Sequence, residues 1–203
     1  MCGRFALEPG DDFYDRFDIT NQLSKLPQKI DAVPGKDIPV ILKEKTNIVR
    51  LMRWGLVPFW AKDEKIGFKM FNARAETILE KPSFQKAFKT QRCLVPASGF
   101  YEWKVDGDKK TPYFFEIGSR PLISLAGLFD IWIEPFHQKQ IYSFTIITTQ
   151  PNSVVKPIHD RMPVILKEKE EKMWLDESKS PEELLSLLIP STESLDSRLH
   201  NFA

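Results

Sequence analysis

Fifteen prolines scattered along 203 residues are the feature that most constrains how this chain folds. Proline fixes φ and lacks a backbone N–H, so it stops helices and is excluded from central strands. Long helices and long uninterrupted strands are therefore not expected. The spacing instead predicts many short elements joined by turns.

The apolar pattern favours strands over helices. Seven segments are rich in β-branched or aromatic residues and are bounded by turn or charged residues, which predicts strands at 40–42, 47–52, 93–95, 113–117, 122–128, 141–149 and 164–166. Asp106-Gly107 predicts a hairpin turn. Helices are expected at 11–17, 76–88, 167–175 and 181–188. The sequence therefore predicts a strand-rich α+β protein with a single domain over residues 1–203.

Charge and cysteine content limit the class of protein. The formal net charge is +1, which argues against nucleic-acid binding driven by bulk charge but leaves room for a local basic groove. Two cysteines do not make a disulfide framework, which favours a reducing cytoplasm. No apolar run reaches transmembrane length and no signal-peptide stretch opens the chain, so a cytoplasmic protein without membrane contact is expected.

Residue 2 is a cysteine, and its position gives it a special chemistry. Trimming of Met1 would leave Cys2 with a free α-amine beside its thiol. An α-amine has a pKa near ~7.7–8.0, so an appreciable fraction is neutral and nucleophilic at pH 7. Such a 1,2-aminothiol captures an aldehyde first as an imine and then as a thiazolidine ring. The alternative is that Cys2 is a small buried apolar residue, as most free cysteines are.

Two polar residues lie two positions apart in the segment 71–77. If this segment is extended, the side chains of Asn72 and Arg74 point the same way and suit a sugar–phosphate group. The alternative is that Asn72 caps the following helix and Arg74 pairs with Glu76.

Two further segments carry candidate proton-transfer groups. Glu102 lies between Tyr101 and Trp103, and a carboxyl shielded by rings has a raised pKa that suits a general acid. Its alternative is a solvent-facing side chain on a strand. His159 follows a strand-to-turn stretch and can move protons near neutral pH, unless it is a plain surface histidine.

Together these segments resemble the SRAP family (SOS response-associated peptidase-like proteins), whose members act on abasic sites in DNA. The resemblance runs from residue 2 to at least residue 166, and its motifs are residues 1–5, 53–58, 72–77, 92–103 and 159–163. It implies a single domain with a curved, largely antiparallel sheet, a barrel-like core and flanking helices. One departure is Asp31, which stands where the family usually has asparagine.

The resemblance also implies roles for particular residues. Cys2 becomes the crosslinking nucleophile, supported by Asn72, Glu102 and His159. The implied contacts to DNA phosphate, sugar or bases are Arg4, Arg74, Arg161 and Trp54. Further rings that could stack on bases are Phe59, Trp60, Tyr101 and Trp103.

The expected partner is single-stranded DNA that contains an abasic site, with the protein a monomer that needs no obligate protein partner and joins the nucleoid when bound to DNA. No cofactor is expected, and no Cys/His set has zinc spacing. Two alternatives stay open. One is a thiol peptidase using Cys2, His159 and Asn72, which includes removal of its own Met1. The other is a non-catalytic module that binds single-stranded DNA.

Overall fold

The computed structural model describes residues 2–135 and 138–202. Its strands are β1 (Phe5–Leu7), β2 (Ile30–Ala32), β3 (Asp37–Lys43), β4 (Asn47–Trp54), β5 (Asn72–Arg74), β6 (Arg92–Ala97), β7 (Gly99–Asp106), β8 (Lys109–Glu116), β9 (Ile123–Ile133), β10 (Gln140–Thr149), β11 (Met162–Pro163), β12 (Ile165–Leu166) and β13 (Asp196–Leu199). Its helices are α1 (Phe13–Arg16), α2 (Pro82–Thr90), α3 (Glu168–Leu175), α4 (Pro181–Leu185) and the 3₁₀ helices η1 (Glu64–Lys69) and η2 (Ala75–Thr77).

Five strands close into a barrel. The hydrogen-bonded order β10-β4-β3-β6-β9 returns to β10 through the β9–β10 pairing. The β4–β10 pairing is parallel, and the other four pairings of the ring are antiparallel. A short strand, β5, pairs with β10 in parallel. The predicted strand-rich, largely antiparallel and barrel-like core is confirmed.

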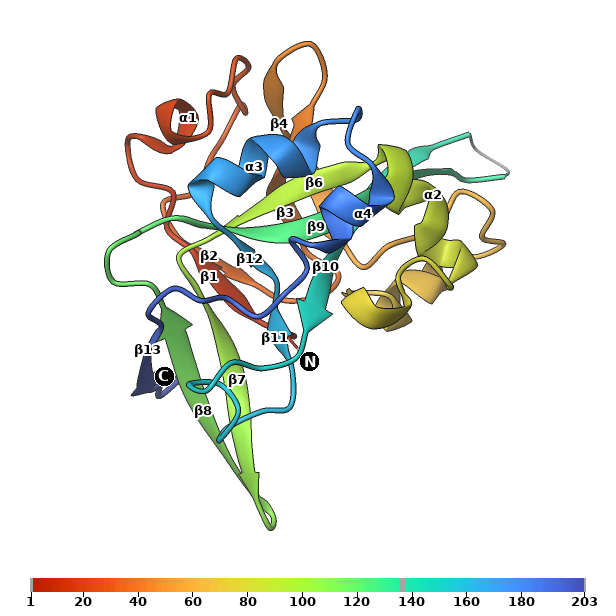
Figure 1. Ribbon diagram of the computed structural model, residues 1–203. Coiled ribbons are helices and arrows are strands. Elements are labelled where there is room, and N and C mark those ends of the chain that lie inside the picture. Colours follow the sequence, from red (N-terminus) through yellow and green to blue (C-terminus); the bar gives the residue numbers. More distant parts are fainter. Residues whose placement is uncertain (1, 136–137, 203) are drawn as a thin grey trace.

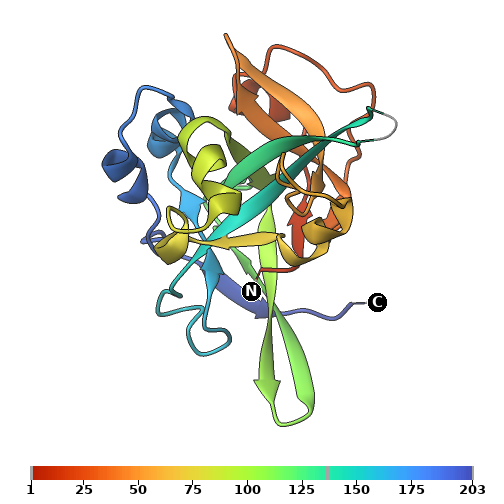
Figure 2. The ribbon, with the colours of Figure 1, turned by 90° about the vertical axis from the view of Figure 1, so that its right-hand side faces the viewer.

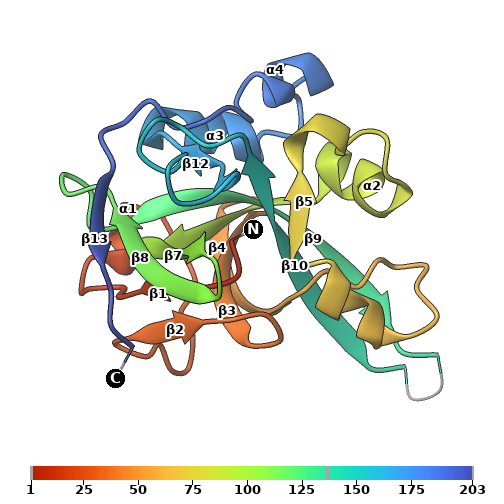
Figure 3. The same ribbon diagram turned by 90° about the horizontal axis from the view of Figure 1, so that it is seen from below.

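A second sheet holds the beginning of the chain. Its order is β13-β8-β7-β1-β2, so the N-terminal strand lies between two antiparallel neighbours. Phe5 of β1 is fully buried, and its ring centroid lies 5.1 Å from that of Trp54 on the barrel strand β4. This contact joins the two sheets. Figure 3 shows the N-terminus close to the barrel strands.

Helices cover one face of the barrel. Figure 1 shows α3 and α4 in front of the strands, with α2 beside them. Trp174 of α3 is fully buried, donates its indole N–H to the Cys93 carbonyl on β6 at 3.0 Å and packs edge-on against Phe88 of α2. Helix α4 begins as its sequence dictates, because Ser180 accepts a hydrogen bond from the Glu183 N–H and Pro181 occupies the first turn.

The predicted elements compare closely with those of the structure, with one correction. All seven predicted strands overlap a strand of the structure. The predicted single helix over 76–88 is wrong, because the chain forms η2, leaves the helix and begins α2 at Pro82. Pro82 has no N–H to donate and its ring would clash with the carbonyl four residues back, so the helix starts at the proline.

The hairpin of β7 and β8 projects from the body of the molecule (Figures 1 and 2). Asp106 pairs with Lys109 across a two-residue loop, in which Gly107 has a φ of 57°. A left-handed residue at this place matches the twist of the two strands, as the Asp-Gly sequence predicts. Among the described residues, no helix is long and apolar enough to cross a membrane.

Gly55 follows the end of β4 and packs closely against the backbone of Gly67. Its φ is 125°, and an added Cβ would lie 2.6 Å from the Gly67 carbonyl oxygen. Gly55→Ala is therefore expected to lower the free energy of unfolding by at least about 1–3 kcal/mol, the cost of the strained backbone alone. Urea denaturation followed by circular dichroism measures this loss.

Gly107→Ala is the matched control for the backbone effect. Its φ is also positive, at 57°, but an added Cβ would meet nothing within 4 Å. The expected loss is about 1 kcal/mol. Equal losses for the two variants would show that the close approach of Gly55 to Gly67 does not constrain the fold.

Candidate active site

The segment before β1 carries Cys2 to the edge of strand β7. The Tyr101 N–H donates to the Arg4 carbonyl at 2.9 Å, and continuing this register by one residue puts Gly3 opposite Glu102. Cys2 itself is fully buried in the chain that still carries residue 1. Burial and the neighbouring Glu102 carboxylate both raise the pKa of the Cys2 thiol far above its usual value. The two side chains are therefore close enough to interact.

Glu102 points inward from β7. It is 2% exposed, so the alternative of a solvent-facing side chain is wrong. Burial penalises the charged carboxylate and raises the pKa of Glu102 to about 7. A carboxyl group with this pKa can both give and take a proton near neutral pH.

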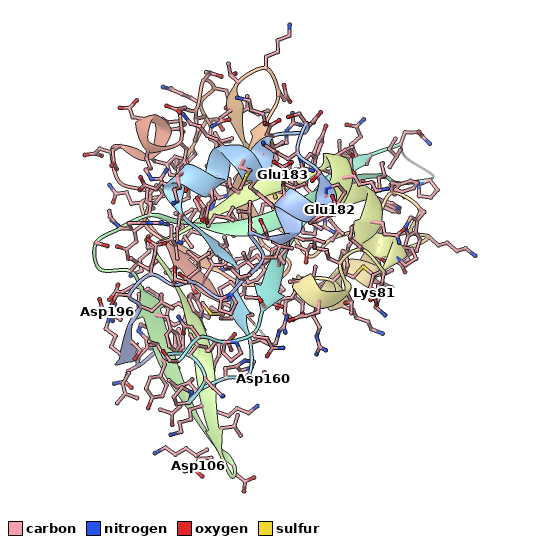
Figure 4. All side chains as sticks on the ribbon, in the orientation of Figure 1. Lys81, Asp106, Asp160, Glu182, Glu183 and Asp196 are labelled. Atoms are coloured by element: carbon pink, nitrogen blue, oxygen red, sulfur yellow. The ribbon has the colours of Figure 1, made fainter. Side chains whose placement is uncertain are left out.

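His159 faces the same carboxyl group from the loop that precedes β11. Its Nε2 lies 3.6 Å from Glu102 Oε2, and its Nδ1 lies 3.0 Å from the Arg161 backbone nitrogen and 3.2 Å from the Arg161 carbonyl oxygen. Burial lowers the pKa of His159, which favours the neutral imidazole. Asp160, exposed next to it, is labelled in Figure 4 at the lower edge of the body beside the base of the hairpin.

Asn72 lies on β5, which runs near the N-terminus (Figures 2 and 3). Its amide nitrogen donates to the Phe71 carbonyl at 3.0 Å. Its Oδ1 is buried and has no hydrogen-bond partner among the described residues. A buried acceptor without a partner is costly, so this oxygen is available to a donor such as a substrate hydroxyl.

The two arginines that follow in the predicted site differ in their surroundings. Arg74 is exposed on β5, where it shares a strand face with Asn72 as the spacing predicts. Arg161 has a side chain that is 7% exposed, and its guanidinium pairs with both carboxylate oxygens of Glu76 at 2.7 and 2.9 Å. In the absence of DNA this guanidinium is engaged with Glu76, and the expected contact of Arg161 with DNA stays a prediction.

Glu76 was overlooked as a site residue. The sequence suggests Arg74 as its partner two positions away, whereas its partner is Arg161, 85 positions later. The only signal in the sequence is a carboxylate in one motif and an arginine in another, which does not reveal a pair before the fold is known.

The expected role of Trp54 as a stacking surface is wrong. Trp54 is 1% exposed, stacks on Phe144 at 6.2 Å and donates its indole N–H to the Phe71 carbonyl at 2.8 Å. It is a core residue and holds the backbone next to Asn72. In the segment between β4 and β5, the exposed aromatic rings are Phe59, Trp60 and Phe68. Phe68 was missed because its segment lacks a recognisable motif.

Arg4 is held by its own protein. Its guanidinium makes two hydrogen bonds to the Asp31 carboxylate, at 2.7 and 2.5 Å, and lies 3.8 Å from the centre of the Phe202 ring. This pairing lowers the pKa of Asp31. The unusual residue at position 31 thus places a negative charge beside a residue expected to bind phosphate.

Of the predicted site residues, His159 lines a cavity of about 560 Å³, whose other lining residues are Gln150, Pro151, Lys156, Pro157, Ile158 and Asp160. This volume suits a small-molecule ligand or one nucleotide unit. A larger cavity of about 1250 Å³ lies between α1, α3 and the β3–β4 hairpin, and none of the predicted site residues lines it. Within residues 2–135 and 138–202, no group of three His, Cys, Asp or Glu side chains is placed to hold a metal ion.

The arrangement combines two buried groups, those of Cys2 and Glu102, with the half-buried side chain of His159. A neutral imidazole, a carboxyl group that titrates near pH 7 and the N-terminal cysteine meet where β1 approaches β7. Such a set can transfer protons and supply a nucleophile without a fixed charge. The unpartnered Oδ1 of Asn72 adds a hydrogen-bond acceptor beside the terminus.

Comparisons with known proteins point to one family. A family model described as SOS response associated peptidase (SRAP) matches residues 1–200. Abasic site processing protein YoaM of Bacillus subtilis (strain 168) is 47% identical over 197 residues, which cover 94% of this chain and 86% of YoaM. Abasic site processing protein HMCES of Xenopus tropicalis is 33% identical over 189 residues, which cover 77% of this chain and 56% of HMCES. A crystal structure of a protein from Bacteroides thetaiotaomicron superposes with a TM-score of 0.90 at 32% identity, covering 98% of this chain and 92% of that one.

The raised pKa of Glu102 predicts how stability depends on pH. Below about pH 4.5 Glu102 is protonated in both the folded and the unfolded chain and does not lower stability. As the pH rises from about 4.5 through about 7, the unfolded chain releases a proton that the folded chain keeps, so the free energy of unfolding falls. Glu102→Gln removes this cost. The free energy of unfolding of Glu102→Gln relative to the unsubstituted protein is expected to rise by roughly 3 kcal/mol between pH 4 and pH 8.

Urea denaturation at a series of pH values measures this difference. Asp106→Asn at the exposed hairpin tip controls for the loss of one carboxyl group. A difference between Glu102→Gln and the unsubstituted protein that stays constant from pH 4 to pH 8 would contradict the assigned environment of Glu102.

Proposed function

The chain belongs to the SRAP family, and from this premise we propose that it recognises abasic sites in single-stranded DNA and crosslinks to them through Cys2 after Met1 has been removed. Its relatives YoaM and HMCES are named abasic site processing proteins. The single observation that carries the proposal is the meeting of Cys2, Glu102 and His159 at the N-terminus of the chain. Met1 itself lies outside the described residues.

An abasic deoxyribose is mostly a closed ring and must open before it reacts. Opening moves the proton of the C1 hydroxyl to the ring oxygen and leaves an aldehyde at C1. Glu102, with a pKa of about 7, gives the proton to the ring oxygen and receives the other from the hydroxyl. General acid–base help of this kind is worth about 10²–10⁴-fold in rate.

Covalent capture then takes two steps. The neutral α-amine of Cys2 adds to C1, and loss of one water molecule leaves an imine. The thiol then adds across the C=N bond, so that sulfur bonds to C1 and the thiol proton moves to nitrogen. This closure needs no free thiolate, which agrees with the raised pKa of the Cys2 thiol.

The neighbouring side chains assist these steps. His159, neutral and directed at Glu102, shuttles protons while the imine forms. Asn72 accepts a hydrogen bond from the sugar through its unpartnered Oδ1. Trimming of residue 1 is essential, because it frees the amine and removes the residue directly ahead of the buried Cys2.

A single strand suits this site better than a duplex, because the terminus and its partners must approach the sugar from several sides. Arg74 is exposed beside Asn72 and is the proposed phosphate contact. Phe68, 67% exposed, offers a face on which a flanking base can stack, worth about 1–3 kcal/mol. Arg4 reaches a phosphate only by giving up its bonds to Asp31.

The two alternative functions receive less support. A thiol peptidase needs an activated thiolate, and burial raises the pKa of the Cys2 thiol instead. Asn72 donates to the Phe71 carbonyl, and Nδ1 of His159 is bonded to the Arg161 backbone, so no Cys–His–Asn triad is formed by these three residues. Peptidase activity is proposed only for removal of Met1. A non-catalytic module would not explain the buried carboxyl group and imidazole.

Substitution of Cys2 tests the proposal directly. Cys2→Ala keeps the α-amine but loses the thiol, so the crosslink to an abasic single-stranded oligonucleotide is expected to disappear from a denaturing gel and to return only when borohydride reduces the imine. Mass spectrometry of the unsubstituted protein should map the adduct to residue 2. Cys93→Ala, which removes the other buried thiol, is the control and should crosslink normally. A stable crosslink in Cys2→Ala without reductant would refute the proposal.

Substitution of Arg74 tests the DNA contact. Arg74→Ala is expected to weaken binding of a single-stranded oligonucleotide and to reduce by about one the slope of log affinity against log salt concentration. Fluorescence anisotropy at several salt concentrations measures both. Lys43→Ala, at the remote cavity between α1 and α3, is the matched loss of one positive charge. The same change of slope in both variants would mean that Arg74 makes no specific phosphate contact.

A further inference from the structure

Residues 196–202 lie against the second sheet, whose strands also carry Glu102 and lead to Cys2. The first part of this segment is β13, which pairs with β8 at the edge of the sheet (Figures 1 and 3). The His200 N–H then donates to the Pro112 carbonyl at 3.0 Å, which continues the strand pairing by one residue. Phe202 follows and is 38% exposed, so its ring lies on the surface of the protein and is not enclosed by it.

The ring of Phe202 is stacked on a side chain that follows Glu102 directly. Successive residues of a strand point to opposite faces, so Trp103 points outward from β7 where Glu102 points inward. The Phe202 and Trp103 ring centroids are 6.0 Å apart, and the two planes are 16° from parallel. Tyr101, on the same outer face, lies 5.0 Å from the Phe202 ring. An unpaired base stacks on an aromatic side chain in this way, so Phe202 occupies a place that suits a base.

Phe202 also covers the guanidinium of Arg4. The central carbon of that guanidinium lies 3.8 Å from the centre of the Phe202 ring. The Asp31 carboxylate accepts two hydrogen bonds from the same guanidinium, at 2.7 and 2.5 Å, and neutralises its charge. Arg4 comes two residues after Cys2, a span of at most about 7 Å in extended chain. A group well placed for a phosphate next to a sugar at Cys2 is therefore engaged by the protein itself.

The contacts of Phe202 are of a strength that DNA can replace. One surface stack or cation–π contact changes an equilibrium by about two- to tenfold. A single strand offers the same two kinds of partner, because it brings a base to Trp103 and a phosphate to Arg4. Exchange of Phe202 for a strand therefore loses little and leaves the remaining contacts of the strand as a gain.

We propose that residues 196–202 form a displaceable strap, which together with Asp31 masks Arg4 and Trp103 until a single strand displaces Phe202. The inference rests on the proposed function, because it concerns how DNA reaches the same site. The strap lowers the affinity for every single strand. A strand that is captured covalently at Cys2 stays bound in spite of it, so the strap favours damaged strands over intact ones.

Phe202→Ala removes the competing ring. Its affinity for a fluorescein-labelled single-stranded oligonucleotide without abasic sites is expected to rise by at least about threefold, because the open surface no longer has to be freed first. Fluorescence anisotropy measures this change. Leu199→Ala is the matched control, since Leu199 is a 64% exposed apolar residue of the same segment, and its affinity should stay as in the unsubstituted protein. An unchanged affinity in Phe202→Ala would overturn the inference, and so would a loss, which would make Phe202 itself a DNA contact.

Asp31→Asn tests the second restraint on Arg4. Asparagine has nearly the shape of aspartate but no charge, so Arg4 no longer gives up an ion pair when it meets a phosphate. The affinity for the undamaged oligonucleotide is expected to rise, and the slope of log affinity against log salt concentration to steepen by about one. In an Arg4→Ala background the same change should alter affinity by less than about twofold. An equal gain in both backgrounds would show a general charge effect and overturn the masking of Arg4.

Displacement itself is read from 4-fluorophenylalanine incorporated at position 202. Saturation with the undamaged oligonucleotide is expected to move its ¹⁹F resonance toward the position of the free amino acid. A resonance that stays in place while the oligonucleotide binds would overturn the inference. If abasic DNA binds but is not crosslinked, the proposed function fails, whereas the anisotropy and ¹⁹F measurements still decide on the strap. Absence of binding in every variant would overturn both.

Discussion

The pairing of β1 with β7 is the contact on which the site depends. Strand β1 is only three residues long, yet it lies between β2 and β7, and Phe5 anchors it to Trp54 on the barrel. This places residue 2 beside Glu102, a residue one hundred positions later in the chain. A free terminus would otherwise fray, because the first residues of a domain are poorly ordered unless they are tied into a sheet. The reactive groups at this chain end are therefore held in place as firmly as residues of the core.

Removal of water sets the chemical character of this place. Burial raises the pKa of the Cys2 thiol and the Glu102 carboxyl group and lowers the pKa of His159, so all three are shifted toward their uncharged forms. Proton transfers between neutral partners suit imine chemistry, in which water must be lost and a thiol proton must find a nitrogen. Burying these ionisable groups lowers the folding stability of the protein. The packed aromatic core around Trp54 and Phe144 offsets this loss.

The sequence predicts local features well and distant partners poorly. All seven predicted strands exist because their β-branched runs and flanking turn residues act locally, and Pro82 alone explains the one misjudged helix. Trp54 was misjudged because burial depends on which face of a strand meets the barrel. The pairing of Arg161 with Glu76 was not foreseen because the two residues lie 85 positions apart in the chain. Glu102 illustrates the same limit, since its sequence allowed both an inward and an outward side chain, and only the packing of β7 decides between them.

The shortness of the link between Cys2 and β1 has a practical consequence for anyone who handles this protein. Two residues separate Cys2 from Phe5, so the terminus has no slack with which to move aside. Any purification tag fused ahead of Cys2 converts its amine into an amide and has to be cleaved without a scar. The projecting hairpin offers a better place for a label, because nothing lies within 4 Å of a Cβ added at Gly107.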